Sequence, residues 1–143
     1  SDGASALILA SESAVQAQGL KPMAKIVAHA RSSRLPAEFT LAPVDAISSL
    51  LKKTGWSADD VDLWEINEAF AMVTMLAMKA HGLDHSKVNV HGGACAQGHP
   101  IGSTGSRIIV TLMHAMHHYG KERGVAALCI GGGEATAVAI EKC

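Results

Sequence analysis

Short apolar runs alternate with stretches of helical periodicity along this chain of 143 residues. Runs typical of β-strands cover 4–10, 23–30, 61–66, 88–90, 125–129 and 135–140. Helical patterns lie between them, over 11–19, 43–55, 68–81 and 103–119. The pattern over 68–81 is apolar on nearly every side, which predicts a largely buried helix.

The alternation of strands and helices predicts the fold class. It favours right-handed crossover connections and a sheet whose strands are mainly parallel. The last two strands are joined only by Gly131-Gly132-Gly133, which is too short for a crossover, so they are expected to pair antiparallel. We therefore expect an α/β fold with a five-stranded, mostly parallel sheet, helices on both faces and an antiparallel last strand.

Composition and charge exclude several function classes. Hydrophobic residues make up 48% and charged residues 17%, so the chain can build a core. The net charge of −1 argues against a nucleic-acid partner, which normally requires a basic surplus. No apolar run approaches the roughly 18 residues that cross a membrane, and the first residues lack a signal-peptide pattern.

The cysteines and histidines bear on compartment and metal binding. Three cysteines without a C-x-x-C pair are typical of a reducing compartment and argue against a zinc site, so we expect a cytoplasmic protein without a metal. His114, His117 and His118 share one helical face, but no carboxylate or cysteine lies beside them. They are therefore interpreted as a solvated helix end.

Three polar side chains follow three of the predicted strands. Asn67 comes directly after the strand at 61–66, and Cys129 ends the strand at 125–129. His99 lies in the glycine-rich loop after 88–90. Because the carboxyl ends of parallel strands share one edge of a sheet, an amide, an imidazole and a thiol are predicted to converge there.

Each of these residues also has a purely structural interpretation. Asn67 could cap the following helix, Cys129 could be a small buried apolar residue, and His99 could belong to a structural loop. Together they favour chemistry, because Gly131–Gly133 can present backbone N–H groups to an oxyanion. A thiol, an imidazole and such donors suit acyl transfer or the removal of a proton from carbon.

At these residues the chain resembles the thiolase family, in particular the C-terminal half of an acetyl-CoA acetyltransferase. Three motifs carry the resemblance in matching order and spacing: Asn67-Glu68-Ala69-Phe70, Gly98-His99-Pro100-Ile101-Gly102-Ser103-Thr104-Gly105 and Cys129-Ile130-Gly131-Gly132-Gly133. Flanking similarity covers essentially the whole chain. The resemblance implies the joining or thiolysis of acyl chains on coenzyme A thioesters by Claisen chemistry, with two acetyl-CoA molecules yielding acetoacetyl-CoA and CoA.

The resemblance also implies a role for each site residue. His99 would activate a nucleophilic cysteine and help to hold a thioester oxygen. Cys129 would remove a proton from the acetyl methyl group of the second acetyl-CoA. Asn67 would position a water in the first oxyanion hole, and the N–H of Gly131 would contribute to the second.

Further expectations concern the substrate channel and the missing parts. Ala69 and Phe70 would line the pantetheine and acyl channel, and coenzyme A thioester would be the substrate, with no separate cofactor. In the family, the acylated cysteine belongs to the N-terminal half, so this chain is expected to be a fragment that is inactive alone. Residues 1–21 would be the closing strand and helix of that half, and 22–143 the C-terminal domain.

The N-terminal half would be a partner of this chain, and the full-length protein would be a homodimer or homotetramer. The helix at 103–119 would then expose an apolar face in the isolated chain.

Two alternative functions stay open. A ketosynthase-type condensing enzyme usually carries a second histidine where Cys129 stands. A non-catalytic module that binds acyl-CoA or a partner would keep the architecture without the chemistry.

Overall fold

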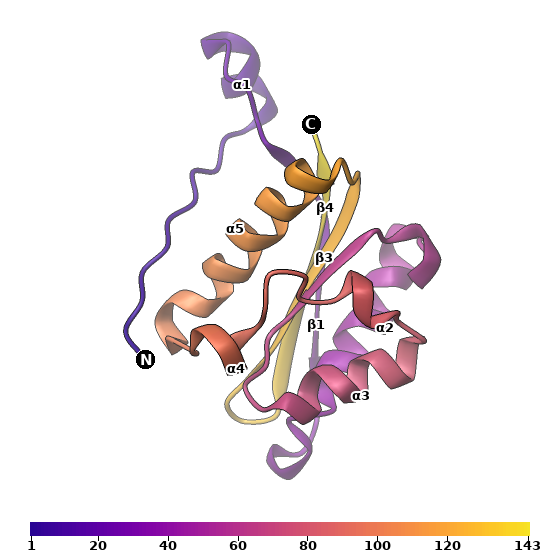
Figure 1. Cartoon of the computed structure of the whole chain (residues 1–143). Coiled ribbons are helices and arrows are strands. Elements are labelled where there is room, and N and C mark those ends of the chain that lie inside the picture. Colours follow the sequence, from indigo (N-terminus) through magenta and orange to yellow (C-terminus); the bar gives the residue numbers. More distant parts are fainter.

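The computed structural model describes residues 1–143 and shows a four-stranded sheet between two helical layers (Figure 1). The strands are β1 (Ala24–Ser33), β2 (Leu63–Ile66), β3 (Arg123–Ile130) and β4 (Glu134–Lys142). The helices are α1 (Glu12–Gln18), α2 (Ala42–Thr54), α3 (Ala71–His81), α4 (Ala94–Gln97) and α5 (Ile101–Tyr119). Short 3-10 turns lie at Pro36–Glu38, Ala58–Asp60 and His85–Lys87.

The strand order β1-β4-β3-β2 corrects the expected sheet. The α/β class is right, and β3 and β4 pair antiparallel as expected. β1, β2 and β3 all run in one direction, but β4 lies between β1 and β3, so two of the three pairings are antiparallel. The prediction of a mostly parallel sheet failed because a strand order is set by long-range pairing, which local patterns do not contain.

The expected strand at 88–90 is reduced to a single bridge. Val88 makes one isolated parallel bridge to Trp64. The next residue, Asn89, has a left-handed backbone with φ of 49°, which turns the chain away from the extended path. The sheet therefore has four strands rather than five.

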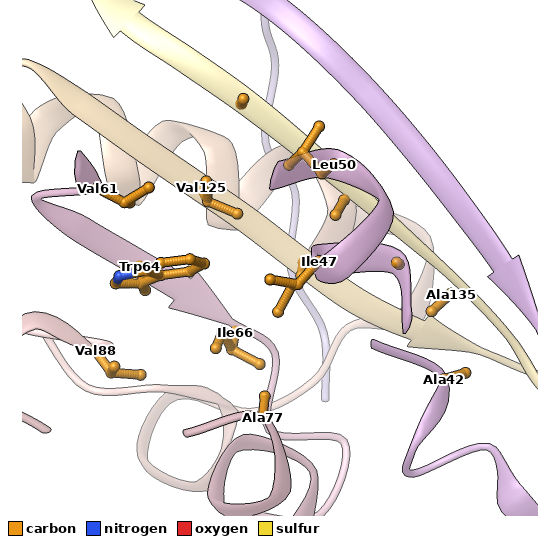
Figure 2. Packing of buried hydrophobic residues seen from close by; sticks show 14 residues of the cluster. Ala42, Ile47, Leu50, Val61, Trp64, Ile66, Ala77, Val88, Val125 and Ala135 are labelled. Atoms are coloured by element: carbon orange, nitrogen blue, oxygen red, sulfur yellow. The ribbon is translucent and has the colours of Figure 1, made fainter. Parts of the chain in front are cut away.

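The larger apolar core lies between the sheet and the layer of α2 and α3. Figure 2 shows Ile47 and Leu50 of α2 packed over the strands, with Trp64 and Ile66 of β2 beside them. All four are essentially fully buried, and each large apolar side chain contributes about 1.5–3 kcal/mol. The strands meet the helix with small residues on this face: Ala127, Ala135, Ala137 and Ala139.

The second core lies between the sheet and α5. Ile108, Leu112 and Met116 of α5 pack against Ala126 and Ile140 of the sheet. At Gly124 of β3, an added Cβ would lie 2.6 Å from the sulfur of Met116, so the helix rests directly on the strand backbone. This close approach fixes the position of α5 over β3.

The exposed apolar face expected on α5 is not found. Its only large exposed apolar residues are Ile101 and Tyr119, at the two ends of the helix. Residues 1–10 run alongside α5 without forming the strand expected at 4–10 (Figure 1). The hydroxyl of Ser5 lies 2.7 Å from that of Ser103. A strand requires a hydrogen-bonded neighbour strand, and this segment contacts α5 instead.

The prediction for 68–81 was also wrong in part. α3 begins at Ala71, and only Val73, Thr74 and Ala77 are buried. Met72 and Met75 are 51% and 66% exposed, because the helix contacts the rest of the chain along one stripe. None of the helices combines the length and hydrophobicity needed to cross a membrane.

Replacing Gly133 by alanine is expected to destabilise the chain more than replacing Gly132. Both residues have left-handed backbones, with φ of 94° and 90°, where an L-residue costs about 1–2 kcal/mol. Only at Gly133 would the new Cβ meet backbone, at the carbonyl oxygens of Arg34 and Leu35. We expect a further loss of about 1–3 kcal/mol there, measured by urea unfolding. Equal losses for both variants would contradict this steric explanation.

Candidate active site

The three predicted site residues lie at one end of the sheet. Asn67 follows β2, Cys129 is the penultimate residue of β3, and His99 lies between α4 and α5. Figure 1 shows these segments at its lower end, where β1, β2 and β3 all finish. The meeting of the three side-chain heads in one hollow stays a prediction.

Asn67 has a buried amide group without a protein partner. Its backbone N–H donates to the carbonyl oxygen of Ala127 at 2.9 Å, which extends the β2–β3 ladder by one residue. The side chain is 1% exposed, and neither Oδ1 nor Nδ2 has a hydrogen bond. The helix-cap interpretation is wrong, because the N-cap of α3 is Phe70. A buried unpaired amide calls for a ligand or water partner.

Asn89 holds the end of β2 in place. Its Oδ1 accepts from the N–H of Ile66 at 2.8 Å, and its Nδ2 donates to the carbonyl oxygen of Ile66 at 2.9 Å. Its own backbone N–H donates to the carbonyl oxygen of Trp64 at 2.8 Å. The Asn89 side chain thus supplies, at the residue before Asn67, the backbone hydrogen bonds that a fifth strand would give.

Glu68 links the same segment to the loop that carries His99. Its Oε2 accepts from the backbone N–H of Cys95 at 2.9 Å, in the first turn of α4. A Cβ at Gly93 would overlap the Glu68 carboxylate, so a side chain at that position would displace the carboxylate from this hydrogen bond. α4 ends at Gln97, two residues before His99.

The hydrogen bonds of His99 select one tautomer. Its Nδ1 lies 2.7 Å from Oγ1 of Thr104, and the Thr104 hydroxyl donates to the carbonyl oxygen of Pro100 at 3.0 Å. With its single hydrogen directed at Pro100, the hydroxyl accepts from Nδ1–H of His99. Nε2 is left with a free lone pair, which is the form that a general base requires.

Cys129 is a buried thiol. It is 7% exposed, and burial raises the pKa of its thiol, although a hydrogen bond with its own backbone acts in the opposite direction. Cys129 pairs with Ala135, a residue of the core under α2. The thiol therefore rests protonated at neutral pH.

The remaining predicted residues surround this edge. Gly131 is exposed in the turn between β3 and β4. Ala69 is half-buried, and Phe70 is 60% exposed. The Phe70 ring meets that of Phe39 edge to face, with 5.8 Å between the centroids. These two rings form an apolar surface beside the edge.

Glu65 and Arg107 form a buried ion pair that sequence reasoning missed. Oε2 of Glu65 lies 3.6 Å from Nη1 of Arg107, and the Glu65 side chain is 2% exposed. Burial raises the pKa of Glu65 to about 7, opposed by Arg107 and reinforced by Glu68. A carboxylate inside an otherwise apolar strand was the available signal.

Thr104, Asn89 and Glu68 were also missed as supporting residues. Thr104 lies five residues after His99, so its contact was within reach of sequence reasoning, whereas the other two act over more than twenty residues. No cluster of three or more His, Cys, Asp or Glu side chains is arranged to hold a metal ion.

The sequence pattern described as "Thiolase, C-terminal domain" matches residues 20–142. A probable acetyl-CoA acetyltransferase of Dictyostelium discoideum is 51% identical, covering 99% of this chain and 34% of that protein. The acetyl-CoA acetyltransferase of Escherichia coli is 48% identical, covering 99% of this chain and 36% of its own length.

Solved structures give the same result. An Ascaris suum thiolase in complex with coenzyme A superposes with a TM-score of 0.89 at 46% identity, covering 94% of this chain and 35% of the other. Human mitochondrial 3-ketoacyl-CoA thiolase with CoA gives 0.91 at 45% identity, covering 94% and 34%. The chain thus spans about a third of the length of these relatives.

Removing the Thr104 hydroxyl is expected to release the tautomer of His99. In Thr104→Val the shape is kept but Nδ1 loses its acceptor, whereas Thr104→Ser retains it. Long-range ¹H–¹⁵N correlation spectra should show protonated Nδ1 in the wild type and in Thr104→Ser, and loss of that preference in Thr104→Val. An unchanged His99 spectrum in Thr104→Val would contradict the assignment.

Glu65 is expected to make stability fall as the pH rises. Its pKa is 4.5 when unperturbed and about 7 in the folded chain, so the native state binds the proton more tightly. This contribution is complete below pH 4.5 and is lost as the pH rises through 7. Relative to Glu65→Gln, wild type should lose about 3 kcal/mol of unfolding free energy over that range. Denaturant unfolding at several pH values measures it, and a constant difference would refute it.

Proposed function

This chain belongs to the thiolase family, and from that premise we propose that it supplies the C-terminal catalytic half of an acetyl-CoA C-acetyltransferase. The reaction is the condensation of two acetyl-CoA molecules to acetoacetyl-CoA and CoA, or the reverse thiolysis. The observation that carries the proposal is the free Nε2 of His99 at the sheet edge where β2 and β3 end. Coenzyme A thioester is the substrate, and no further cofactor is invoked.

The first half-reaction is acyl transfer to a cysteine from the N-terminal half. Nε2 of His99 accepts the proton of that thiol, and the thiolate attacks the thioester carbonyl carbon. The carbon–sulfur bond to CoA breaks, and CoA leaves with a proton returned by His99. The amide of Asn67, buried and unpaired, supplies polar contact through a water near the carbonyl oxygen, which carries negative charge in the intermediate.

The second half-reaction forms the carbon–carbon bond. Cys129 passes its thiol proton to Nε2 of His99, and the resulting thiolate takes a proton from the methyl group of the second acetyl-CoA. The enolate carbon attacks the acyl-enzyme carbonyl, the bond to the nucleophilic cysteine breaks, and the released thiolate recovers its proton from His99. The N–H of Gly131 contributes a donor where oxyanion charge develops. In thiolysis, the steps reverse and Cys129 donates the proton. The raised pKa of its buried thiol supports this donor role.

The apolar surface beside the edge suits the acyl and pantetheine chain. Ala69 and Phe70 line it, and the exposed ring of Phe70 gives an alkyl chain a surface to contact. Relatives of this chain were solved with coenzyme A bound, which supports a thioester ligand.

The proposal also covers the domain boundary, the oligomeric state and the cellular location. Residues 1–21 are assigned to the N-terminal half and 22–143 to the C-terminal domain, whose matched segment begins at 20. The N-terminal half is the partner, in a full-length homodimer or homotetramer. A cytoplasmic location is supported by a 46% identical relative of Mus musculus that is named cytosolic.

A chimera tests the activity. The matching C-terminal third of the Escherichia coli acetyl-CoA acetyltransferase is replaced by this chain, and the cleavage of acetoacetyl-CoA by CoA is followed. We expect turnover, with Cys129→Ala retaining acetylation of the enzyme from acetyl-CoA but losing condensation. His99→Asn should lose both steps by about 10²–10⁴-fold.

Cys95→Ala is the matched control, since this exposed thiol lies outside the proposed chemistry, and it should keep full activity. Undiminished condensation in Cys129→Ala would remove Cys129 from the mechanism. A folded chimera that binds acyl-CoA without turnover would instead support the non-catalytic binding module.

A further inference from the structure

An unusual set of buried polar atoms lies between β2 and α5. These atoms are shielded from solvent and have no hydrogen-bond partner: Oε1 of Glu65, Oδ1 and Nδ2 of Asn67, and Nε, Nη1 and Nη2 of Arg107. Buried polar groups are nearly always paired, with protein or with ordered water. Six unpaired atoms on three side chains therefore call for a further hydrogen-bond partner.

The three side chains share one face of the sheet. Leu63 packs in the core under α5, and Glu65, two residues later, contacts Arg107 of that helix. The ladder bond from the Asn67 N–H to Ala127 keeps the backbone extended through Asn67. Alternation thus puts the Asn67 side chain beside that of Glu65, about 6–7 Å further along the strand.

These three side chains have more hydrogen-bond donors than acceptors, and they make no direct hydrogen bonds to one another. Arg107 has five N–H donors and no acceptor, while the acceptors on this face are the Glu65 carboxylate and Oδ1 of Asn67. The 3.6 Å separation between Arg107 and Glu65 exceeds an ordinary hydrogen bond. A water that lies to one side of this pair, within hydrogen-bond distance of each group, can satisfy both.

We propose that a buried water bridges Arg107, Glu65 and Asn67, and that this network turns Oδ1 of Asn67 toward Arg107. The NH₂ group of Asn67 then points away from Arg107 as a hydrogen-bond donor. Arg107 and Glu65 are positioning residues: they determine which end of a nearly symmetric amide is presented. Only the benefit to an oxyanion rests on the proposed function, because the orientation exists without a substrate.

The network depends on the charge of Glu65. The charged groups that face it are Arg107 of α5 and Glu68 of the following loop, while Ala126 and Leu128 of β3 carry none. Its pKa, raised by burial to about 7, places the change near neutral pH. Below that pH the carboxyl group becomes a donor, and it competes with Arg107 for the acceptors.

The test observes the Asn67 amide in the ¹⁵N-labelled 143-residue chain by NMR. In wild type we expect two resolved NH₂ protons, a cross-peak to a long-lived water, and exchange with solvent at least tenfold slower than for an exposed asparagine. In Arg107→Met the exchange should accelerate at least tenfold. In Glu65→Gln the shift of the NH₂ signals between pH 6 and 8 should disappear, which a merely structural contact would not produce.

Arg123→Met is the matched control, since Arg123 pairs with Glu141 at the opposite end of β3 and should leave Asn67 unchanged. Identical Asn67 signals in wild type and Arg107→Met would overturn the inference. The absence of the water cross-peak in wild type would overturn it even if Arg107→Met does not fold.

The outcome is separable from that of the proposed function. An inactive chimera with a slowly exchanging Asn67 amide refutes the proposed function alone. An active chimera with a freely exchanging amide refutes this inference alone.

Discussion

The geometry of the candidate site depends on the side chain of Asn89, which makes the hydrogen bonds that a neighbouring strand would otherwise make. Asn89 pairs with both backbone groups of Ile66, from a left-handed conformation that asparagine tolerates better than most residues. It satisfies the end of a strand that would otherwise have a free edge. These hydrogen bonds also join the segment before Asn67 to the loop before His99. Glu68 adds a second link, by accepting a hydrogen bond from the first turn of α4.

The two helical layers lie close to the sheet because the sheet residues that face them are small. Alanines on β3 and β4 admit α2, and Gly124 lets α5 lie on the strand backbone. The helices are therefore held by packing over their lengths, and their ends are free to carry polar groups. His99 stands at the beginning of α5 for this reason, supported by the hydroxyl of Thr104 one turn into the helix.

Local patterns predicted most of the helices and strands, but not how the strands assemble into the sheet. The helices at α2 and α5 and the hairpin of β3 and β4 follow from periodicity and from glycines at their ends, which are properties of neighbouring residues. The position of β4 between β1 and β3 depends on pairing across more than a hundred residues, and no local signal contains it. Similarly, the rule for strand ends selected Asn67 and Cys129, but it could not find Asn89 or Arg107, whose partners are distant in sequence.

The insertion of β4 has a consequence for the order of assembly during synthesis. β4 comes last along the chain among the strands, yet it bonds to both of its neighbours and is the only link between β1 and the rest of the sheet. On a ribosome, β1 emerges more than a hundred residues before its partner strand β4, and until then its backbone groups lack their hydrogen-bond partners. β1 is thus exposed to pairing with other chains until β4 has been synthesised.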